Sequence, residues 1–295
     1  MISLFENQLQ KWPSAKKRYE ELEEVKTRRI HLVPDYEIVL QYNPARIIST
    51  GADIKKESIN RRPCFLCENN RPIEQENFEI KKGWQLLVNP FPIFKPHFTI
   101  VSSEHKEQGR IPKEILEFAN IVPGMTVFFN GALAGASAPD HLHLQAVKTD
   151  FLPLMKFVEN VHTLNDKKFM SSAKSKLDFP YIFFSGIKEK NENRETFYDN
   201  FLNFVLNESI PLTFSHEKCN AFAWEDKNGI LRFVIVPRDK HRPDSYYKEG
   251  VEKRLISPGA IDMAGTIILP RKEDFENLNR NEILEIYRQA GISFA

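Results

Sequence analysis

Apolar and polar positions along the chain form short runs that proline interrupts often, which is typical of a protein rich in sheet with scattered helices. Helical periodicity predicts a charged helix broken by a proline near its middle, a short amphipathic helix, a mostly helical charged region and a C-terminal helix: residues 5–29, 111–122, 151–210 and 279–291. Strand-like runs, several with a turn inside, cover residues 29–50, 83–105, 125–147 and 219–241. Exposed loops are expected at residues 60–72 and 186–196.

The second half of the chain contains a weak echo of the first. Residues 219–241 predict a hairpin around Asn228-Gly229, because Asn-Gly is a strong short hairpin signal. The sequence pattern of residues 233–241 resembles that of residues 98–105. Residues 257–275 come after the strand at 233–241 in the same way that the glycine-rich segment and HLHLQ come after the strand at 98–105. We therefore expect an α+β fold, an antiparallel sheet with flanking helices, in two related halves at 1–170 and 171–295.

Composition excludes several classes of protein but does not indicate a function. The 295 residues can bury a sizeable core, and 41% hydrophobic with 27% charged residues is ordinary for a globular protein. A net charge of +1 gives no field that attracts nucleic acid or an anionic membrane. We see no signal-peptide pattern and no apolar run long enough for a membrane span, and three cysteines make no disulfide framework. A cytoplasmic location is the expectation.

The stretch DHLHLQ, residues 140–145, carries the candidate chemistry. Side chains on a strand alternate between faces, so His141, His143 and Gln145 share one face while the leucines between them enter the core. A strand that is merely polar on its outer face is the alternative. The segment 130–140 before it is rich in glycine and alanine, so its backbone can approach a ligand and direct N–H groups at a phosphate. This combination favours a functional site.

Residues 135–146, GASAPDHLHLQA, resemble the active-site segment of the histidine-triad superfamily in its His-x-His-x-Gln branch. That branch includes galactose-1-phosphate uridylyltransferase, diadenosine tetraphosphate phosphorylase and the GDP-hexose phosphorylases. LLVNPFPIF at 86–94 is similar to the segment that holds the nucleoside in the uridylyltransferases, and QYNPARIIST at 41–50 resembles their first-strand motif. The resemblance covers roughly residues 38–147 and implies a histidine-triad-like (HIT-like) fold.

The resemblance implies that His143 attacks the α-phosphorus of a nucleotide and forms a covalent nucleotidyl-imidazole. A neutral imidazole is a competent nucleophile near pH 7, and a backbone carbonyl bonded to its other nitrogen would fix the reactive tautomer. Gln145 can hydrogen-bond a phosphoryl oxygen but cannot deliver a proton to a leaving group. The leaving group must then be a good one, such as phosphate or a sugar phosphate, with a second pKa of about 6. Transfer or phosphorolysis is therefore favoured over hydrolysis.

A metal site is the second candidate feature. Cys64 and Cys67 form a C-x-x-C pair, and zinc takes four ligands, for which His105 and His141 are the further candidates. A redox pair or two buried thiols are the alternatives. Zinc-containing uridylyltransferases use this combination, so the resemblance implies a structural zinc site made of all four residues, with iron as an occasional substitute. His97 is a reserve ligand whose expected role is structural.

Asn89 and Phe91 match the positions at which the family contacts the nucleoside. An asparagine can bond ribose hydroxyls, and a phenylalanine can stack on a base. Pro90 stands where the uridylyltransferase pattern has an acidic residue, which weighs against uridine. The base is therefore left open.

Asn130 and Ser137, together with Gly135 of the small-residue loop, are expected to meet the phosphates. Arg46 is interpreted equally well as a phosphate contact or as an ordinary surface arginine. Residues 236–244, VPRDKHRPD, are basic and could complete a sugar-phosphate pocket from the second half. That half has no His-x-His pair, so it is expected to support the site rather than to form another.

The function that follows is a nucleotidyltransferase or phosphorylase that acts through His143 on a nucleoside diphosphate sugar or a dinucleoside polyphosphate. A non-catalytic, zinc-stabilised nucleotide-binding module and a hydrolase of nucleotide conjugates are the alternatives. Relatives in this branch often pair, so a homodimer is a further expectation. The sequence does not fix the base, the sugar or the acceptor.

Overall fold

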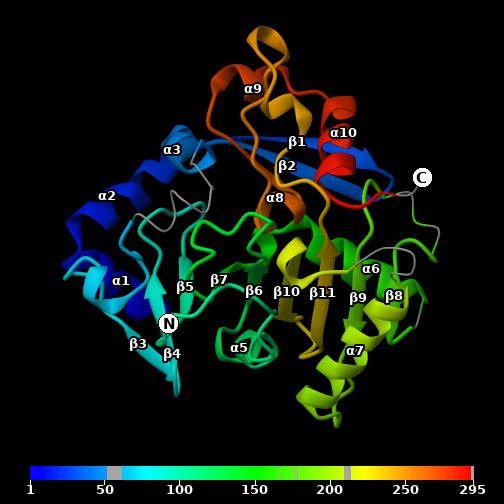
Figure 1. Cartoon of the computed structure of the whole chain (residues 1–295), viewed down its shortest axis with the longest axis horizontal. Helices are drawn as coiled ribbons and strands as arrows, with labels where there is room; N and C mark the ends of the chain where they lie inside the picture. Colours follow the sequence, from blue (N-terminus) through cyan, green and yellow to red (C-terminus); the bar gives the residue numbers. More distant parts are fainter. Residues whose placement is uncertain (52–61, 166, 176, 178, 209–213, 294–295) are drawn as a thin grey trace.

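A computed structural model describes residues 1–51, 62–165, 167–175, 177, 179–208 and 214–293. Among these residues, nine strands form one antiparallel sheet across the centre of the molecule (Figure 1). The order across this central sheet is β3 (Phe78–Lys81), β4 (Trp84–Val88), β5 (His97–Ser102), β7 (His143–Lys148), β6 (Met125–Asn130), β10 (Cys219–Glu225), β11 (Leu231–Pro237), β9 (Phe184–Ile187) and β8 (Phe169–Ser171).

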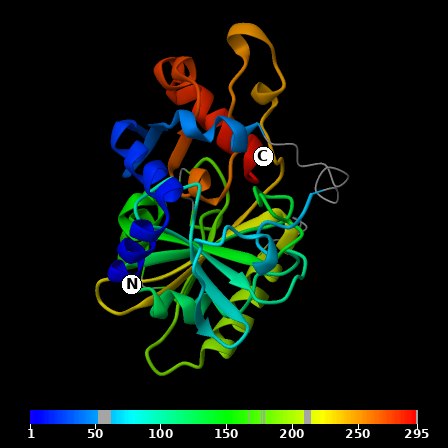
Figure 2. The same cartoon turned by 90° about the vertical axis from the view of Figure 1, so that its left-hand side faces the viewer.

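A smaller three-stranded sheet lies above the central sheet, with the last helices of the chain beside it (Figure 2). Its first two strands pair antiparallel, and the third pairs parallel with the second. Because the third strand comes from the C-terminal part, this small sheet joins the two ends of the chain. Its order is β1 (Lys26–Val33), β2 (Tyr36–Tyr42) and β12 (Thr266–Leu269).

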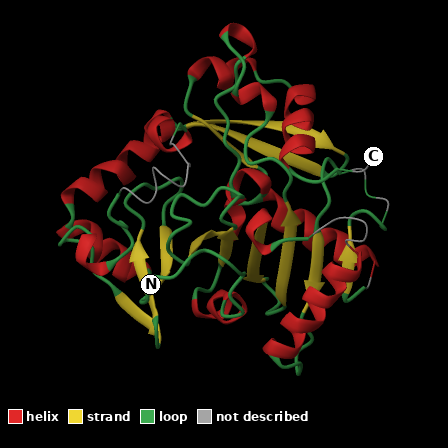
Figure 3. Cartoon of the chain, viewed as in Figure 1, coloured by secondary structure: helices red, strands yellow, loops and turns green. Residues whose placement is uncertain are grey.

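Helices lie on both sides of the central sheet (Figure 3). One hydrophobic core contains α6, α8, α10 and the small sheet, and the other contains α1, α2, α5 and α7. The described helices are α1 (Ile2–Lys11), α2 (Pro13–Glu20), α3 (Ile47–Thr50), α5 (Ile115–Ile121), α6 (Pro153–Asn165), α7 (Arg194–Glu208), α8 (Ala260–Met263), α9 (Lys272–Asn277) and α10 (Arg280–Ala290).

The central strands are buried on both faces, which explains their nearly continuous apolar sequences. In β6, Phe128 packs into the core below the small sheet, while Val127 and Phe129 pack into the opposite core with α5 and α7. Alternation along the strand therefore divides its side chains between two cores rather than between core and solvent. A polar residue on such a strand is buried and needs a hydrogen-bond partner.

The expected α+β fold with an antiparallel sheet and flanking helices is confirmed. The predicted hairpin is present as β10 and β11, with Gly229 at a φ of +73° in its turn. The amphipathic helix near 111–122 is α5, and the C-terminal helix is α10. No helix in the described part of the chain combines the length and the apolar character needed to span a bilayer.

Three sequence predictions of structure were wrong. The helical pattern over 5–29 ends early, because β1 begins at Lys26 and pairs with β2. The region 151–210 is not one helical region, because β8 and β9 lie between α6 and α7; strands this short cannot be assigned by periodicity alone. The strand in residues 257–275, β12, joins β2 of the small sheet, so it does not occupy the place that β7 has in the central sheet.

The division at residue 170 falls inside β8, and the two halves share the central sheet through the pairing of β6 with β10. The division into 1–170 and 171–295 stays a prediction. Residues 60 and 61 of the expected loop at 60–72 lie outside the described residues, as do 166, 176, 178, 209 and 210 of the expected helical region.

Candidate functional site

His143 is the first residue of β7, near the middle of the central sheet. Its ring is buried, and its Nδ1 atom lies 2.8 Å from the main-chain carbonyl oxygen of His141. A carbonyl oxygen can only accept a hydrogen bond, so Nδ1 carries the proton and Nε2 carries the lone pair. The sequence left open which carbonyl would fix the tautomer; in the structure it belongs to His141.

The lone-pair nitrogen of His143 is available. Nε2 makes no hydrogen bond with any described residue, and protein atoms do not cover it completely. Burial lowers the pKa of His143 to about 4, so the ring is neutral at pH 7. A neutral imidazole with an unoccupied lone pair is the reactive form of a histidine nucleophile.

Gln145 lies two residues further on the same face of β7, and His97 fixes the direction of its amide. The Ile93 N–H donates to Nδ1 of His97 at 3.2 Å, so a neutral His97 carries its proton on Nε2. That Nε2–H donates to Oε1 of Gln145 at 2.8 Å. The amide nitrogen of Gln145 therefore points away from His97 and makes no hydrogen bond with a described residue. His97, expected to be structural, holds Gln145 as a donor.

The protonation of His97 yields a prediction for stability against pH. Burial lowers the pKa of His97 to about 3, whereas an unfolded histidine has a pKa of about 6.5. Between these values the unfolded chain binds a proton that the folded chain does not, so stability falls as the pH falls. We expect the free energy of unfolding of wild type to lose about 2.5 kcal/mol more than that of His97→Gln between pH 7.5 and 4.5. Urea unfolding at both pH values measures this difference, and equal losses in the two proteins would contradict the assignment.

Asn130 ends β6 beside His143, and a second set of contacts fixes its amide. The Nη1 of Arg238 donates to Oδ1 of Asn220 at 2.8 Å, so the amide nitrogen of Asn220 must act as a donor. That nitrogen donates to Oδ1 of Asn130 at 3.1 Å, and the Ala260 N–H donates to the same oxygen at 2.7 Å. The Nδ2 of Asn130 is thereby left as a donor without a described partner.

The small-residue loop at 131–140 lies against the second half of the chain. Gly135 has a φ of +96°, and a Cβ there would come within 2.6 Å of the Cα of Gly259. Glycine is thus required at this position by both conformation and space. Ser137 is exposed, and its carbonyl accepts from Nη2 of Arg62, which also pairs with Asp140 at 3.0 Å. The second half therefore contacts this loop through Gly259, and a sugar-phosphate role for the basic stretch at 236–244 stays a prediction.

The predicted nucleoside contacts lie in the turn between β4 and β5. Oδ1 of Asn89 accepts from the Phe91 N–H at 2.8 Å, and its Nδ2 donates to the Thr99 hydroxyl. The Phe91 ring is 57% exposed, and the guanidinium of Arg18 covers one face at 4.3 Å from the ring centre. Arg46 donates to the Phe91 carbonyl at 2.9 Å and thus joins the QYNPAR segment to this turn.

Cys64, Cys67, His105 and His141 come together as one cluster, whose potential ligand atoms all lie within 4.8 Å of one another. Nδ1 of His141 lies 3.2 Å from Sγ of Cys64 and 3.6 Å from Sγ of Cys67, and Nδ1 of His105 lies 3.2 Å from Sγ of Cys67. Tetrahedral zinc would separate such atoms by about 3.3 to 3.8 Å. The donor set and its spacing therefore fit a metal ion.

The tautomer of His141 supports the fit. Its Nε2–H donates to the Ser102 carbonyl at 2.8 Å, which leaves Nδ1 with the lone pair that a metal requires. His141 also supplies the carbonyl that binds His143, so the cluster and the candidate nucleophile share one residue. His97 lies outside the cluster.

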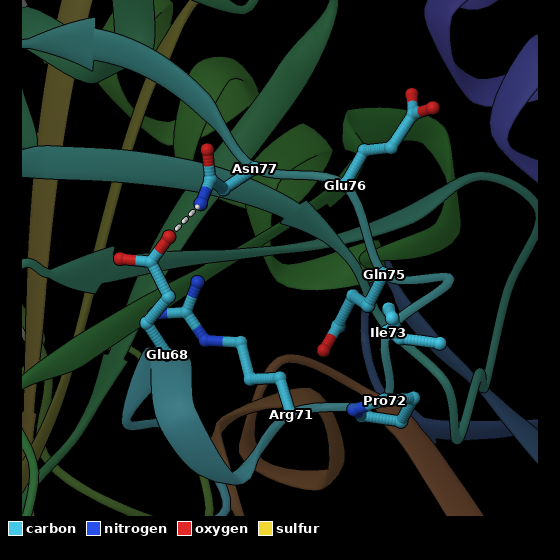
Figure 4. Close-up of a pocket in the computed structure, with 7 residues that line it drawn as sticks. All are labelled: Glu68, Arg71, Pro72, Ile73, Gln75, Glu76 and Asn77. Atoms are coloured by element: carbon cyan, nitrogen blue, oxygen red, sulfur yellow. Dashed lines mark hydrogen bonds between the residues drawn. The ribbon is translucent and has the colours of Figure 1, made fainter.

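A surface hollow of about 480 Å³ adjoins the segment that carries Cys64 and Cys67 (Figure 4). Glu68 follows Cys67 directly, and its carboxylate accepts from Nδ2 of Asn77 at 2.8 Å. Arg71 is held by the Leu66 carbonyl. None of the lining residues is a candidate catalytic residue. The hollow is lined by Glu68, Arg71, Pro72, Ile73, Gln75, Glu76 and Asn77.

Sequence reasoning missed several residues of the site. Gln108 is fully buried and bonds the backbone of His143, yet it lies among charged residues that indicate a surface loop. Asn220 had a weak signal, since it is a polar residue inside an otherwise apolar strand. Arg238 had none beyond its place in a basic stretch.

The structure is an α+β protein in which strand β7 of the central antiparallel sheet presents His143 with an unengaged Nε2. In sequence, the family model described as a domain of unknown function (DUF4922) matches residues 4–148, just under half of the chain. No functionally curated protein matches the sequence.

Among solved structures, the yeast Ap4A phosphorylase in complex with AMP aligns with a TM-score of 0.61 at 16% sequence identity, covering 95% of this chain and 96% of that one. The same enzyme in complex with Ap4A aligns with a TM-score of 0.60 at 15% identity, covering 95% and 96%. An ADP-glucose phosphorylase from Arabidopsis thaliana aligns at 12% identity over 91% of this chain and 99% of that one, but its TM-score of 0.37 does not establish a common fold. The chain therefore shares the fold of the yeast enzyme over nearly its whole length.

Proposed function

We propose that this protein is a nucleotidyltransferase of the phosphorylase type, which transfers a nucleoside monophosphate through a covalent adduct on His143. One observation carries the proposal: the Nδ1–H of His143 is bonded to the His141 carbonyl, and its Nε2 has a lone pair and no partner among the described residues. The likeness to a phosphorylase fold and the motif GASAPDHLHLQA support it.

In the first step, the Nε2 lone pair of His143 attacks the α-phosphorus and the bond to the leaving oxygen breaks, with the electron pair leaving on that oxygen. In the second step, an oxygen of inorganic phosphate or a sugar phosphate attacks the same phosphorus and the P–N bond breaks. The imidazole regains its lone pair, so atoms and charges balance. Two in-line displacements with one intermediate give ping-pong kinetics.

The amide nitrogens of Gln145 and Asn130 are the proposed donors to the phosphoryl oxygens. Their orientations are fixed before substrate binds, because their oxygens are already engaged by His97 and by Ala260 with Asn220. Preorganised donors stabilise charge that develops on the phosphoryl group without reorganisation cost. Neither amide can supply a proton, so the leaving group must depart as a stable anion. That requirement fits a phosphate or a sugar phosphate.

We further propose that Cys64, Cys67, His105 and His141 bind zinc, whose role is structural. Bound there, zinc would supply a fixed point for the His141 ring, and the chain from His141 to His143 would be held in turn. The proposed substrate class is a nucleoside diphosphate sugar or a dinucleoside polyphosphate. The protein itself is proposed to act in the cytoplasm, as a homodimer. Asn89, Phe91, Arg46, Gly135 and Ser137 remain the proposed substrate contacts.

The test is a panel of four nucleotides, diadenosine tetraphosphate, ADP-glucose, UDP-glucose and GDP-mannose, each incubated with the purified protein and read by intact-protein mass spectrometry. We expect one of them to add the mass of a nucleoside monophosphate to the protein. Inorganic phosphate or a sugar phosphate should then remove this added group. AMP binding without any adduct from the panel would instead favour a non-catalytic binding module. Loss of the adduct to water alone, at the same rate with and without phosphate, would favour a hydrolase.

Gln145→Glu tests the donor role of the amide. The variant keeps the shape and the oxygen that bonds His97, but it replaces the donor by a carboxylate that repels the phosphoryl oxygens. We expect the rate constant of adduct formation to fall about 10²- to 10³-fold, as for the loss of one oxyanion donor. Rapid-quench kinetics with the best nucleotide of the panel measures it. Gln10→Glu, the same change at an exposed helix position, is the control, and equal rates in both variants would rule out this role.

A further inference from the structure

Gln108 lies in the segment that leads from β5 to α5, and its side chain enters the central sheet. Its neighbours Lys106 and Glu107 are exposed, while Gln108 is 1% exposed. A buried amide in a charged surface segment needs hydrogen-bond partners that outweigh its desolvation. Those partners identify what the residue does.

The partners of Gln108 lie where β6 and β7 separate. The two strands pair regularly from Met125 to Phe128, and the pairing stops there. Two residues beyond the last pair on each strand, the amide nitrogen of Gln108 donates to the carbonyls of Asn130 at 2.8 Å and His143 at 2.9 Å. Its amide oxygen accepts from the His143 N–H at 2.8 Å. The side-chain amide thus replaces the missing ladder bonds with a bridge between the strands.

The main chain of the same segment holds the far end of the small-residue loop. The Gln108 N–H donates to the Pro139 carbonyl at 2.9 Å, and the Leu142 N–H donates to the Lys106 carbonyl at 2.6 Å. The loop therefore leaves the sheet after Asn130 and returns before His143 with both ends fixed by one segment. The Gln108 segment thus allows β6 and β7 to separate while the buried main-chain groups at the opening stay hydrogen-bonded.

We propose that Gln108 is a positioning residue for the reaction at His143, an inference that rests on the proposed function. By holding both the N–H and the carbonyl of His143, it fixes the backbone from which the ring projects. The ring then meets the His141 carbonyl through Nδ1 and presents Nε2 to the phosphorus. A misplacement of about 1 Å at a reacting centre can cost on the order of 100-fold in rate.

The chain offers a matched control in Gln8. This residue is also fully buried, its amide nitrogen donates to the Glu74 carbonyl at 2.6 Å, and its oxygen accepts from the Glu76 N–H at 2.7 Å. It joins α1 to the segment before β3, and neither of these hydrogen bonds involves β7. Replacing either glutamine by methionine removes a buried amide bridge of similar size, but only one bridge holds His143.

The experiment compares Gln108→Met with Gln8→Met well below their melting temperatures. We expect Gln108→Met to slow adduct formation from the best panel nucleotide by about 10- to 100-fold, with the Kd for AMP nearly unchanged. Gln8→Met should lower Tm but leave the adduct rate within about twofold. Long-range ¹H–¹⁵N spectra of the histidine rings, with His143 assigned through His143→Ala, should show a single Nδ1–H tautomer in wild type and a mixture in Gln108→Met.

Equal adduct rates in the two methionine variants, or an unchanged His143 tautomer in Gln108→Met, would overturn the inference. If Gln108→Met fails to fold, Gln108→Asn against Gln8→Asn decides, because the shorter amide can reach one strand but not both. Absence of any adduct in wild type would defeat the proposed function instead. The tautomer spectra would then still test whether Gln108 positions the ring, since they need no substrate.

Discussion

Replacing His143 by alanine should abolish the covalent nucleotidyl adduct and reduce turnover by on the order of 10⁴-fold or more, as for the loss of a catalytic nucleophile. The physical reason is that no other described side chain next to the Gln145 amide offers an unengaged imidazole lone pair, since His97 uses both ring nitrogens and His141 uses Nε2 for the Ser102 carbonyl and Nδ1 in the cysteine cluster. Intact-protein mass spectrometry and steady-state assays with the panel nucleotides measure both effects.

His162→Ala is the matched control for this prediction. His162 is buried like His143, burial lowers its pKa to about 4, and its Nδ1 is bonded to the Lys167 carbonyl at 3.0 Å. Its Nε2, however, is engaged by the Ser185 hydroxyl at 2.8 Å. We expect His162→Ala to lose stability but to form the adduct. An adduct that persists in His143→Ala would refute the assignment of the nucleophile.

Mutation of the proposed metal ligands is expected to have the second-largest effect, on stability and on rate together. A metal present at 100 times its Kd stabilises the folded state by about 2.7 kcal/mol, which corresponds to a Tm higher by roughly 4 °C in a chain of this size. Cys64→Ser with Cys67→Ser should therefore lower Tm by about that amount. Because His141 bonds His143, adduct formation should also slow by about 10- to 100-fold, as when outer-shell contacts of a site are lost.

Plasma mass spectrometry for bound metal and calorimetry with and without a chelator check this prediction. Cys219→Ser is the control, because Cys219 is a fully buried thiol outside the cluster. It should keep the metal and should respond to the chelator as wild type does. Stoichiometric metal in the double cysteine variant, or a wild-type Tm that a chelator leaves unchanged, would show that the cluster is not a metal site.

The candidate residues most accessible to sequence reasoning are those whose residue types and spacing are themselves the signal. The spacing of Cys64 and Cys67 indicates two ligands of one metal ion. The two-residue period of a strand indicates that His143 and Gln145 lie on the same face of that strand. The structure brings these residues to the places that such local rules require. Even the tautomer of His143 depends on a carbonyl only two residues away.

Secondary structure was predictable where periodicity was unambiguous, as in the Asn228-Gly229 hairpin and in α10. It was not predictable for β9, whose four residues are too few for periodicity to separate a strand from other structure. Nor did pattern indicate that β12 would leave the central sheet for β2, because pairing partners are set by packing between distant segments.

The sequence by itself therefore determined which reactive groups this protein has and how neighbouring ones alternate along a strand. Only the tertiary structure decided which way the amides of Gln145 and Asn130 face, through partners 48 to 130 positions away in the chain, and that Gln108 bridges two strands beside His143. The physical reason is that a hydrogen bond depends on position within about 3 Å, and strands far apart in sequence reach that distance only when the register of the whole sheet is set.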